Sequence, residues 1–256
     1  AATVCVNPAN ASCQPTVAAG VAAASAGDTV SIAKGFYNEN VTVPVGKDGL
    51  VIKGGRTAVL DGDDPLTGVT LTIDSDDVTV QGLTFRNGNQ AAIVSTGNGT
   101  VVRGVTVTGP DGACIQLNGD CSTVERSLLN GCGDNAIDVN ADDVVIARNK
   151  IFHCDESCID IAGDGAVVER NTTQITEDSF MIDLAGDNAE IVGNKLDNAD
   201  AELIFASGDN LLIQGNKLTH GFAAFDVGGT NPMIVKNRAQ HLHGGTDGMR
   251  VVCNTD

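Results

Sequence analysis

The feature that most constrains the fold is a sequence period of about 22 residues that runs from near residue 69 to near residue 247. Each repeat opens with a short apolar segment, and a second apolar segment follows after a turn. A single repeat of this kind cannot bury its own apolar face, so neighbouring repeats must stack as the rungs of a solenoid. The period therefore predicts a parallel β-helix. The opening segments are VTLTI (69–73), AAIVS (91–95), CIQL (114–117), AIDV (136–139), CIDI (158–161), MIDL (181–184), LIFA (203–206) and AFDV (224–227).

The segment before the repeats predicts a helical cap. Residues 14–25 (QPTVAAGVAAAS) place Val17, Val21 and Ala24 on one face of a short helix. An open solenoid end exposes apolar core and unpaired backbone, so we expect this helix to cover the N-terminal end. The chain is interpreted as one β-helix domain, 1–256, with an N-terminal cap (1–30), rungs (31–240) and a C-terminal end (241–256). The irregular stretch 241–248 is expected to cover that second end.

The composition limits the classes of partner that the chain can be expected to bind. The net charge is −18, with 33 acidic residues against 15 Lys and Arg, so nucleic acid is not an expected partner. No apolar stretch reaches the roughly 20 residues of a membrane-spanning helix. Aromatic residues make up only 3% of the chain, which suits a narrow interior filled by stacked Val, Ile and Leu. Oligomeric state is left open.

The eight cysteines indicate an oxidising compartment, which means a secreted, periplasmic or cell-surface protein. Cys5 and Cys13 lie in a turn-rich start and are predicted to form a disulfide. Cys132 and Cys154 are one period apart, and stacked strands lie about 4.8 Å apart, near the Cα separation that a disulfide accepts. We predict a second disulfide between them. The other four cysteines are assigned no partner: Cys114, Cys121, Cys158 and Cys253.

A family resemblance is carried by the segment AGDTVSIAKGFYNENVTV (26–43), followed by LVIKGG (50–55) and VLDGDD (59–64). This opening resembles that of right-handed parallel β-helix proteins of the pectate-lyase-like superfamily. The later repeats resemble the generic β-helix repeats of carbohydrate-binding proteins and sugar hydrolases. The resemblance implies an all-β, single-stranded, right-handed parallel β-helix of about ten rungs. It implies little about activity, because this fold hosts lyases, hydrolases, epimerases, esterases and non-catalytic adhesins.

Stacking in register turns each repeat position into a column, and two polar columns have a structural interpretation. Asparagines at a turn bond one another and the turn backbone; this column is Ser127, Asn149, Asn171, Asn194, Asn216 and Asn237. Aspartates in Gly-Asp and Asp-Asp turns bond the local backbone in the same way. We call this second set the turn column: Asp76, Asn98, Asp120, Asp142, Asp164, Asp187 and Asp209.

A third column is the candidate site. Period-2 alternation points Asp138, Asp160 and Asp183 out of three successive rungs, and we call these residues the acidic strip. Carboxylates about 4.8 Å apart repel one another, so a pKa should rise, a proton should be shared, or a cation such as calcium should bind to all three. No other cofactor is expected. The residues expected to contact a bound substrate are Gln116 and Phe205 in the same column and Asp134, Asp155 and Glu156 at its rim.

The chemistry that best fits the strip is inverting glycoside hydrolysis, which needs an acid and a base about 6.5–9.5 Å apart. Asp138 and Asp183 are two rungs apart, and Asp160 between them should raise one pKa. The run CDESC (154–158) resembles the acidic pair of polygalacturonase-like glycoside hydrolases. Asn135 and Ser157 replace acids of that motif, so no catalytic role is transferred from it.

The expected partner is therefore a polysaccharide or glycan. A polysaccharide lyase or epimerase is less favoured because the strip has no basic side chain. A non-catalytic scaffold, adhesin or surface-binding protein remains the alternative.

Overall fold

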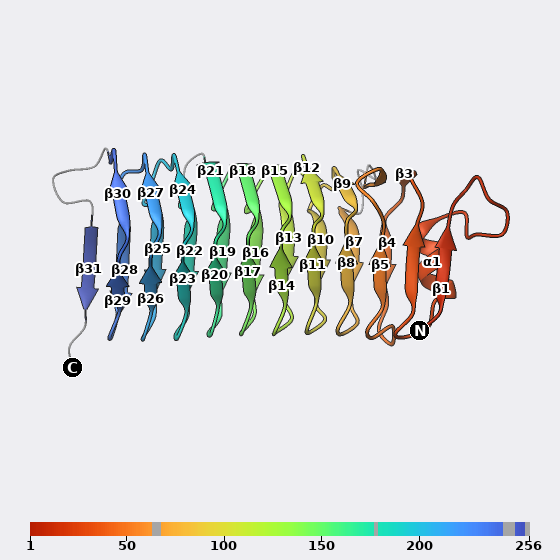
Figure 1. The fold of residues 1–256 in the computed structure, drawn as a ribbon, viewed down its shortest axis with the longest axis horizontal. Coiled ribbons are helices and arrows are strands. Elements are labelled where there is room, and N and C mark those ends of the chain that lie inside the picture. The colour runs from red at the N-terminus through yellow and green to blue at the C-terminus, as the bar shows by residue number, and fades with distance from the viewer. Residues whose placement is uncertain (63–67, 177–178, 243–248, 254–256) are drawn as a thin grey trace.

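The computed structural model describes residues 1–62, 68–176, 179–242 and 249–253. Within them the chain winds through three parallel sheets that run side by side along the molecule (Figure 1). Each rung contributes one strand to each sheet, and the strand pairing advances by about 22 residues, as in Ile115, Ile137 and Ile159. The predicted all-β parallel β-helix is confirmed, and so is the stacking of Ile137 on Ile159.

The sheets contain eleven, ten and ten strands in the described part of the chain. Sheet A contains β1 (Thr3–Val6), β2 (Thr29–Ile32), β5 (Val51–Lys53), β8 (Thr79–Gln81), β11 (Val101–Arg103), β14 (Thr123–Glu125), β17 (Val145–Ala147), β20 (Val167–Glu169), β23 (Glu190–Val192), β26 (Leu212–Gln214) and β29 (Met233–Val235). Sheet B contains β3 (Gly35–Asn38), β6 (Ala58–Asp61), β9 (Thr84–Arg86), β12 (Thr106–Thr108), β15 (Leu128–Cys132), β18 (Lys150–Cys154), β21 (Thr172–Thr176), β24 (Lys195–Asp197), β27 (Lys217–Thr219) and β30 (Arg238–Gln240). Sheet C contains β4 (Val41–Val43), β7 (Val69–Ile73), β10 (Ala91–Ser95), β13 (Ala113–Leu117), β16 (Ile137–Asn140), β19 (Ile159–Ala162), β22 (Ile182–Ala185), β25 (Ile204–Ser207), β28 (Phe225–Gly229) and β31 (Met249–Cys253).

One short helix, α1 (Val17–Ala23), packs against β1, β2 and β4 at the N-terminal end of the stack (Figure 1). The Thr16 hydroxyl accepts the backbone N–H of Ala19 at 3.1 Å and so caps the first turn. Val17 and Val21 are buried against the first rungs. The predicted capping helix is confirmed. At the opposite end β31 pairs with β28, and most of the stretch expected to cover that end, 243–248, lies outside the described residues.

The asparagine column is structural, as predicted. The side-chain amide of Asn149 donates to the side-chain oxygen of Asn171 at 3.1 Å and to the backbone carbonyl of Val124 at 2.9 Å, and the pattern repeats along the column. The residue before each asparagine has a left-handed backbone, such as Arg148 with φ 58°. Where this preceding residue is an arginine, it also pairs with a glutamate, as Arg148 does with Glu169 at 3.4 Å.

The turn column is structural as well. Each side-chain oxygen accepts the backbone N–H of the residue one rung further on, for example Asp164 from Asp187 at 2.8 Å. Because these turn amides have no partner within their own rung, the carboxylates complete the backbone hydrogen bonding. The same bond joins successive members of the column from Asp76 to Asp209, and Asp209 accepts from Thr230 at the end of the column.

The disulfide predictions have opposite outcomes. The bond between Cys5 and Cys13 is confirmed, with a Cα separation of 5.0 Å. The predicted bond between Cys132 and Cys154 is wrong: Cys132 bonds Cys114, with a Cα separation of 5.4 Å. Cys132 and Cys154 are register partners as expected, but side chains of in-register strands run parallel, which keeps their Cβ atoms further apart than the roughly 3.8 Å typical of a disulfide. Cys154 and Cys158 are buried free thiols.

None of the described helices is long and apolar enough to cross a membrane. The interior of the β-helix is filled by the inward-pointing side chains of the three sheets. Ile93, Ile115 and Ile137 are fully buried, and Leu129 and Val124 face them from the other two sheets. This packing fixes which residues of sheet C point outward, and so it positions the acidic strip.

Candidate functional site

The acidic strip lies on the outer face of sheet C. Asp138 of β16, Asp160 of β19 and Asp183 of β22 are direct register partners, so they form a straight row across three rungs. The flanking residues of each strand, such as Ile137 and Val139, are buried in the core. Alternation along each strand therefore forces the aspartates outward, where their side chains are half-buried. The predicted row is confirmed as a geometric feature.

Burial is the main influence on these carboxylates. It raises the pKa of Asp183 to about 6, and the charge of Asp160 adds to the effect. Burial likewise raises the pKa of Asp138, with further contributions from the charges of Asp160 and Asp134. A carboxyl group with a pKa near 6 keeps a protonated fraction close to neutral pH. Asp183 can therefore serve as a proton donor.

Asp160 differs from its neighbours because its hydrogen-bond donor is buried, whereas Asn140, which donates to Asp138 at 3.4 Å, is exposed. The side-chain amide of Asn135 donates to the Oδ2 atom of Asp160 at 3.1 Å. Burial raises the pKa of Asp160 and the charge of Asp134 adds to it, but the bond from Asn135 acts in the opposite direction. Asn135 is 8% exposed, so its amide is fixed in place. Sequence reasoning noted Asn135 only as a departure from a motif and missed this role.

The rim residues divide into two groups. Asp134 and Glu156 lie close enough for the charge of Asp134 and a hydrogen bond between the two side chains to raise the pKa of Glu156. Asp155 is exposed and lines a hollow of about 340 Å³ together with Asp111 and His153, neither of which belongs to that pair. His153 is anchored there through its Nδ1 atom, 3.0 Å from the side-chain oxygen of Asn130. The predicted rim is therefore two separate features.

An aromatic pair follows the acidic strip. Phe205 of β25 is the register partner of Asp183, and its ring stacks on that of Phe180 with centroids 5.0 Å apart and planes inclined by 24°. Both rings are partly exposed. Phe180 was not predicted, although it occupies the position that Asn135 and Ser157 hold in the preceding rungs. At the other end of the strip Gln116 is the register partner of Asp138, so the predicted residues of this column form one continuous row.

The described residues contain no group of three or more His, Cys, Asp or Glu side chains gathered to hold a metal ion. The strip carboxylates stand one per rung in a line, whereas calcium requires six to eight oxygen ligands around a centre. Calcium binding at Asp138, Asp160 and Asp183 remains a prediction. Glu177 and Asp178, which continue the rim in the sequence, lie outside the described residues.

The model of the family described as "Right handed beta helix region" matches residues 38–180, which is more than half of the chain. A comparison with curated proteins gives no match. Among solved structures, an alginate lyase from Paenibacillus sp. str. FPU-7 aligns with a TM-score of 0.64 at 15% identity over 93% of this chain and 99% of its own. Pectate lyase Pel9A aligns with a TM-score of 0.63 at 12% identity over 93% and 79%.

A third structure is the surface adhesin PfbA of Streptococcus pneumoniae, with a TM-score of 0.57 at 10% identity over 88% of this chain and 85% of its own. Identities this low demonstrate a common fold and nothing more specific. The family match and these neighbours confirm the predicted right-handed parallel β-helix of the pectate-lyase-like type.

Proposed function

Because this chain belongs to the right-handed β-helix family, we propose that it is an exported protein that binds a polysaccharide along the acidic strip and hydrolyses it. The observation that carries the proposal is a row of three half-buried carboxyl groups with raised pKa values, next to a stacked aromatic pair. Such a cluster on an outer face is costly unless it serves a ligand. Two structural neighbours are named as lyases of alginate and pectate, which supports a carbohydrate ligand.

In the proposed reaction Asp183 is the general acid. Its pKa of about 6 lets it deliver a proton to the glycosidic oxygen near neutral pH. Asp138, two rungs away, is the general base that activates water. Their backbones are about 9–10 Å apart at the usual strand spacing, and the side chains need to lean only slightly to reach the 6.5–9.5 Å of an inverting pair. Asp160 between them keeps the pKa of Asp183 raised.

The flanking residues supply substrate contacts. The Phe205 and Phe180 rings offer an apolar face on which one sugar ring can lie, with its glycosidic bond over Asp183. Gln116 at the other end offers an amide to sugar hydroxyls. The two disulfides support export, because such bonds persist in oxidising compartments.

Hydrolysis fits the strip better than elimination. A lyase needs a base beside a uronate and a positive charge to neutralise that uronate. The row from Gln116 to Phe205 contains no Lys or Arg, and three aspartates would repel a uronate. We therefore expect a neutral stretch of glycan over the strip.

The proposal is tested by incubating the protein with a panel of neutral and acidic polysaccharides and measuring new reducing ends. We expect cleavage of a neutral glycan, with inversion at the anomeric carbon when the product is followed by NMR. Retention would instead assign the chemistry to Asp160 and Asp183, whose adjacent rungs lie near the 5–5.5 Å of a retaining pair. Phe205→Ala should weaken binding, and Phe36→Ala, which removes a 57% exposed ring from sheet B, is its control.

The competing function is a non-catalytic adhesin or surface-binding scaffold. It is favoured by the open sheet face on which the strip lies and by the structural likeness to an adhesin. Binding of a glycan without any new reducing ends would support this function. The proposal would be contradicted if the protein neither bound nor cleaved any member of the panel.

A further inference from the structure

A second column of like charges lies on sheet B. Lys195 of β24, Lys217 of β27 and Arg238 of β30 are successive register partners, and Lys150 of β18 precedes them beyond Thr172 of β21. We call the four cationic residues the basic column. All four are exposed. In a chain with 15 basic and 33 acidic residues, such a concentration on one line is a distinct feature.

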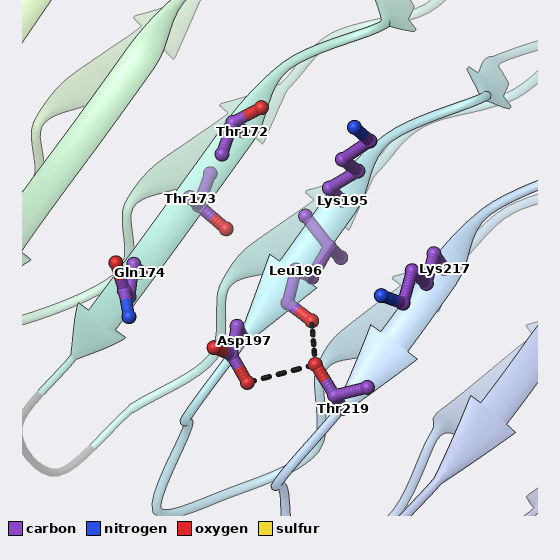
Figure 2. A pocket seen from close by; sticks show the side chains of 8 residues that line it. All are labelled: Thr172, Thr173, Gln174, Lys195, Leu196, Asp197, Lys217 and Thr219. Carbon is purple, nitrogen blue, oxygen red and sulfur yellow. Dashed lines mark hydrogen bonds between the residues drawn. The ribbon is translucent and has the colours of Figure 1, made fainter.

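The basic column borders a hollow of about 180 Å³ (Figure 2). Thr172, Lys195 and Lys217 lie along one side of it, and Gln174, Asp197 and Thr219 lie along the other. Leu196, almost fully buried, lies between the two sides. The hollow therefore combines two ammonium groups with hydroxyl and amide groups over an apolar floor.

The one carboxylate in this hollow is already engaged. Asp197 accepts the Thr219 hydroxyl at 2.7 Å and lies 2.7 Å from the Nδ1 atom of His220. Burial acts to raise the pKa of Asp197, but these two bonds and the charges of His220 and Lys217 outweigh it and hold the pKa below its usual range. Asp197 is thus hydrogen-bonded to Thr219 and to His220, and it also feels the charge of Lys217 across the hollow.

The basic column itself has no ion-pair partner within 4 Å among the described residues. The arginines that directly follow strands of sheet A give the contrast. Each of them pairs with Glu125 or Glu169 at 3.4–3.8 Å: Arg126, Arg148 and Arg170. Like charges on directly opposed strand positions are destabilising. The chain neutralises one cationic column with its own glutamates and leaves the other available to an external anion.

The geometry indicates what that anion is. Cations repeated about every 4.8 Å along a line fit a chain with several negative groups better than a single small ion. The hydroxyl and amide groups of Thr172, Gln174 and Thr219 suit a ligand rich in hydroxyls. The hollow has no aromatic ring for stacking bases, and a net charge of −18 opposes the dense phosphates of nucleic acid.

We propose that the basic column and its hollow bind the carboxylate or sulfate groups of an acidic polysaccharide. This site is on sheet B, whereas the acidic strip is on sheet C, and the two have opposite charge. It therefore goes beyond the proposed hydrolysis: sheet B holds the protein on an anionic glycan, and sheet C acts on neutral sugar. Binding at the basic column does not depend on turnover at the strip.

The experiment uses the full chain and the double variant Lys195→Gln/Lys217→Gln, which removes two charges and keeps side-chain length. Binding to polygalacturonate, to dextran sulfate, to unsubstituted dextran and to double-stranded DNA is measured by calorimetry at about 50 mM and about 500 mM salt. We expect the wild type to bind at least one anionic polymer, more weakly at high salt, and the variant to bind it about tenfold more weakly. Arg126→Gln/Arg148→Gln is the matched control, since it removes two ion-paired charges, and it should bind within about twofold of the wild type.

Each outcome is decisive when the melting temperatures show that both variants are folded. A loss with polygalacturonate alone assigns the site to carboxylates, and a loss with dextran sulfate alone assigns it to sulfates. Equal weakening in the two double variants would mean that only net charge matters and would overturn the proposal. Failure of the wild type to bind either anionic polymer, or tighter binding to double-stranded DNA than to both, would also overturn it. Cleavage of neutral glycan should be unchanged by Lys195→Gln/Lys217→Gln, so failure here is distinguishable from failure of the proposed hydrolysis.

Discussion

Two columns of aspartates follow the same period through this molecule, and their environments are opposite. In the turn column each carboxylate accepts a backbone N–H from the next rung, and at Asp209 the bond from the Thr230 backbone lowers the pKa. In the acidic strip the backbone amides are already used by sheet C, so the carboxylates have burial without backbone donors, and the pKa of Asp183 rises to about 6. The donors that face a column, more than the residue type, decide whether it stabilises the fold or is available for chemistry.

Asp160 is the intermediate case. It belongs to the acidic strip, but the buried amide of Asn135 gives it the kind of donor that every member of the turn column has. The strip is thereby made unequal: the pKa values of all three carboxyl groups are raised, but at Asp160 the bond from Asn135 opposes part of the rise.

The largest expected effect is the loss of turnover when Asp183 of the acidic strip is replaced. Asp183→Asn should reduce turnover of the cleaved glycan by 10²–10⁴-fold, the usual contribution of a general acid, with an equal or higher melting temperature. Asp120→Asn in the turn column removes the same charge and should leave turnover unchanged, because Asn98 already makes the same backbone bond in the preceding rung. Steady-state kinetics and thermal melts of the two variants provide the measurement. Equal losses of turnover would show that the two columns do not differ in function.

The second effect concerns the covalent bond next to the strip. Cys114→Ser/Cys132→Ser opens a disulfide with a sequence separation of 18 and should cost about 3 kcal/mol of unfolding free energy in urea. Cys121→Ser, at an exposed free thiol, should change stability by less than about 0.5 kcal/mol. Mass mapping of the unreduced protein should find Cys114 joined to Cys132. A peptide joining Cys132 to Cys154 would contradict the structure.

A third effect concerns the contribution of the turn column to the free energy of unfolding. Asp142→Ala leaves the backbone N–H of Asp164 without its acceptor, now bonded at 2.8 Å, and should cost about 0.5–1 kcal/mol because that amide is exposed to water. Asp142→Asn keeps an acceptor and should cost almost nothing. In the acidic strip, by contrast, Asp138→Asn removes charge repulsion, so the free energy of unfolding should stay the same or increase. Urea denaturation of the three variants decides this, and a stabilising Asp142→Ala would refute the structural role of the turn column.

Much of this could be predicted from the sequence, because a solenoid converts a repeat directly into contacts. The period was sufficient to place Ile137 on Ile159 and to align Asp138, Asp160 and Asp183. The asparagine ladder followed from the same argument.

What could not be predicted are contacts that cross from one column to another. Asn135 reaches Asp160, 25 positions further along the chain, and Phe180 reaches Phe205 around the corner that precedes sheet C. The disulfide of Cys132 with Cys114, in place of its register partner Cys154, was missed for the same reason. The direction of each Cβ atom at a corner is not encoded in the period. The basic column was missed because Thr172 interrupts it and because the register of sheet B is needed to see it.

The last expected effect is a pH dependence of stability in which Asp183 of the acidic strip and Asp209 of the turn column act in opposite directions. The pKa of Asp183 is about 6 in the folded protein and has a usual value near 3.8, so the folded state binds the proton more tightly. Its contribution to stability is complete below about pH 4 and is lost as the pH rises through about 6. Asp209 has a lowered pKa, so its contribution is present above about pH 4 and is lost as the pH falls further.

These opposed contributions should give a stability maximum near pH 4–5, below the usual optimum of pH 5–8. Because Asp183 is half-buried and screened by solvent, we expect the decline from pH 4 to pH 7 to be about 1 kcal/mol smaller in Asp183→Asn than in the wild type. Asp120→Asn should keep the wild-type decline, since it leaves the strip intact. Chemical denaturation at closely spaced pH values tests this. Identical slopes for the wild type and Asp183→Asn would mean that Asp183 titrates like an ordinary surface carboxylate, and the difference between the two columns would then be one of hydrogen bonding alone.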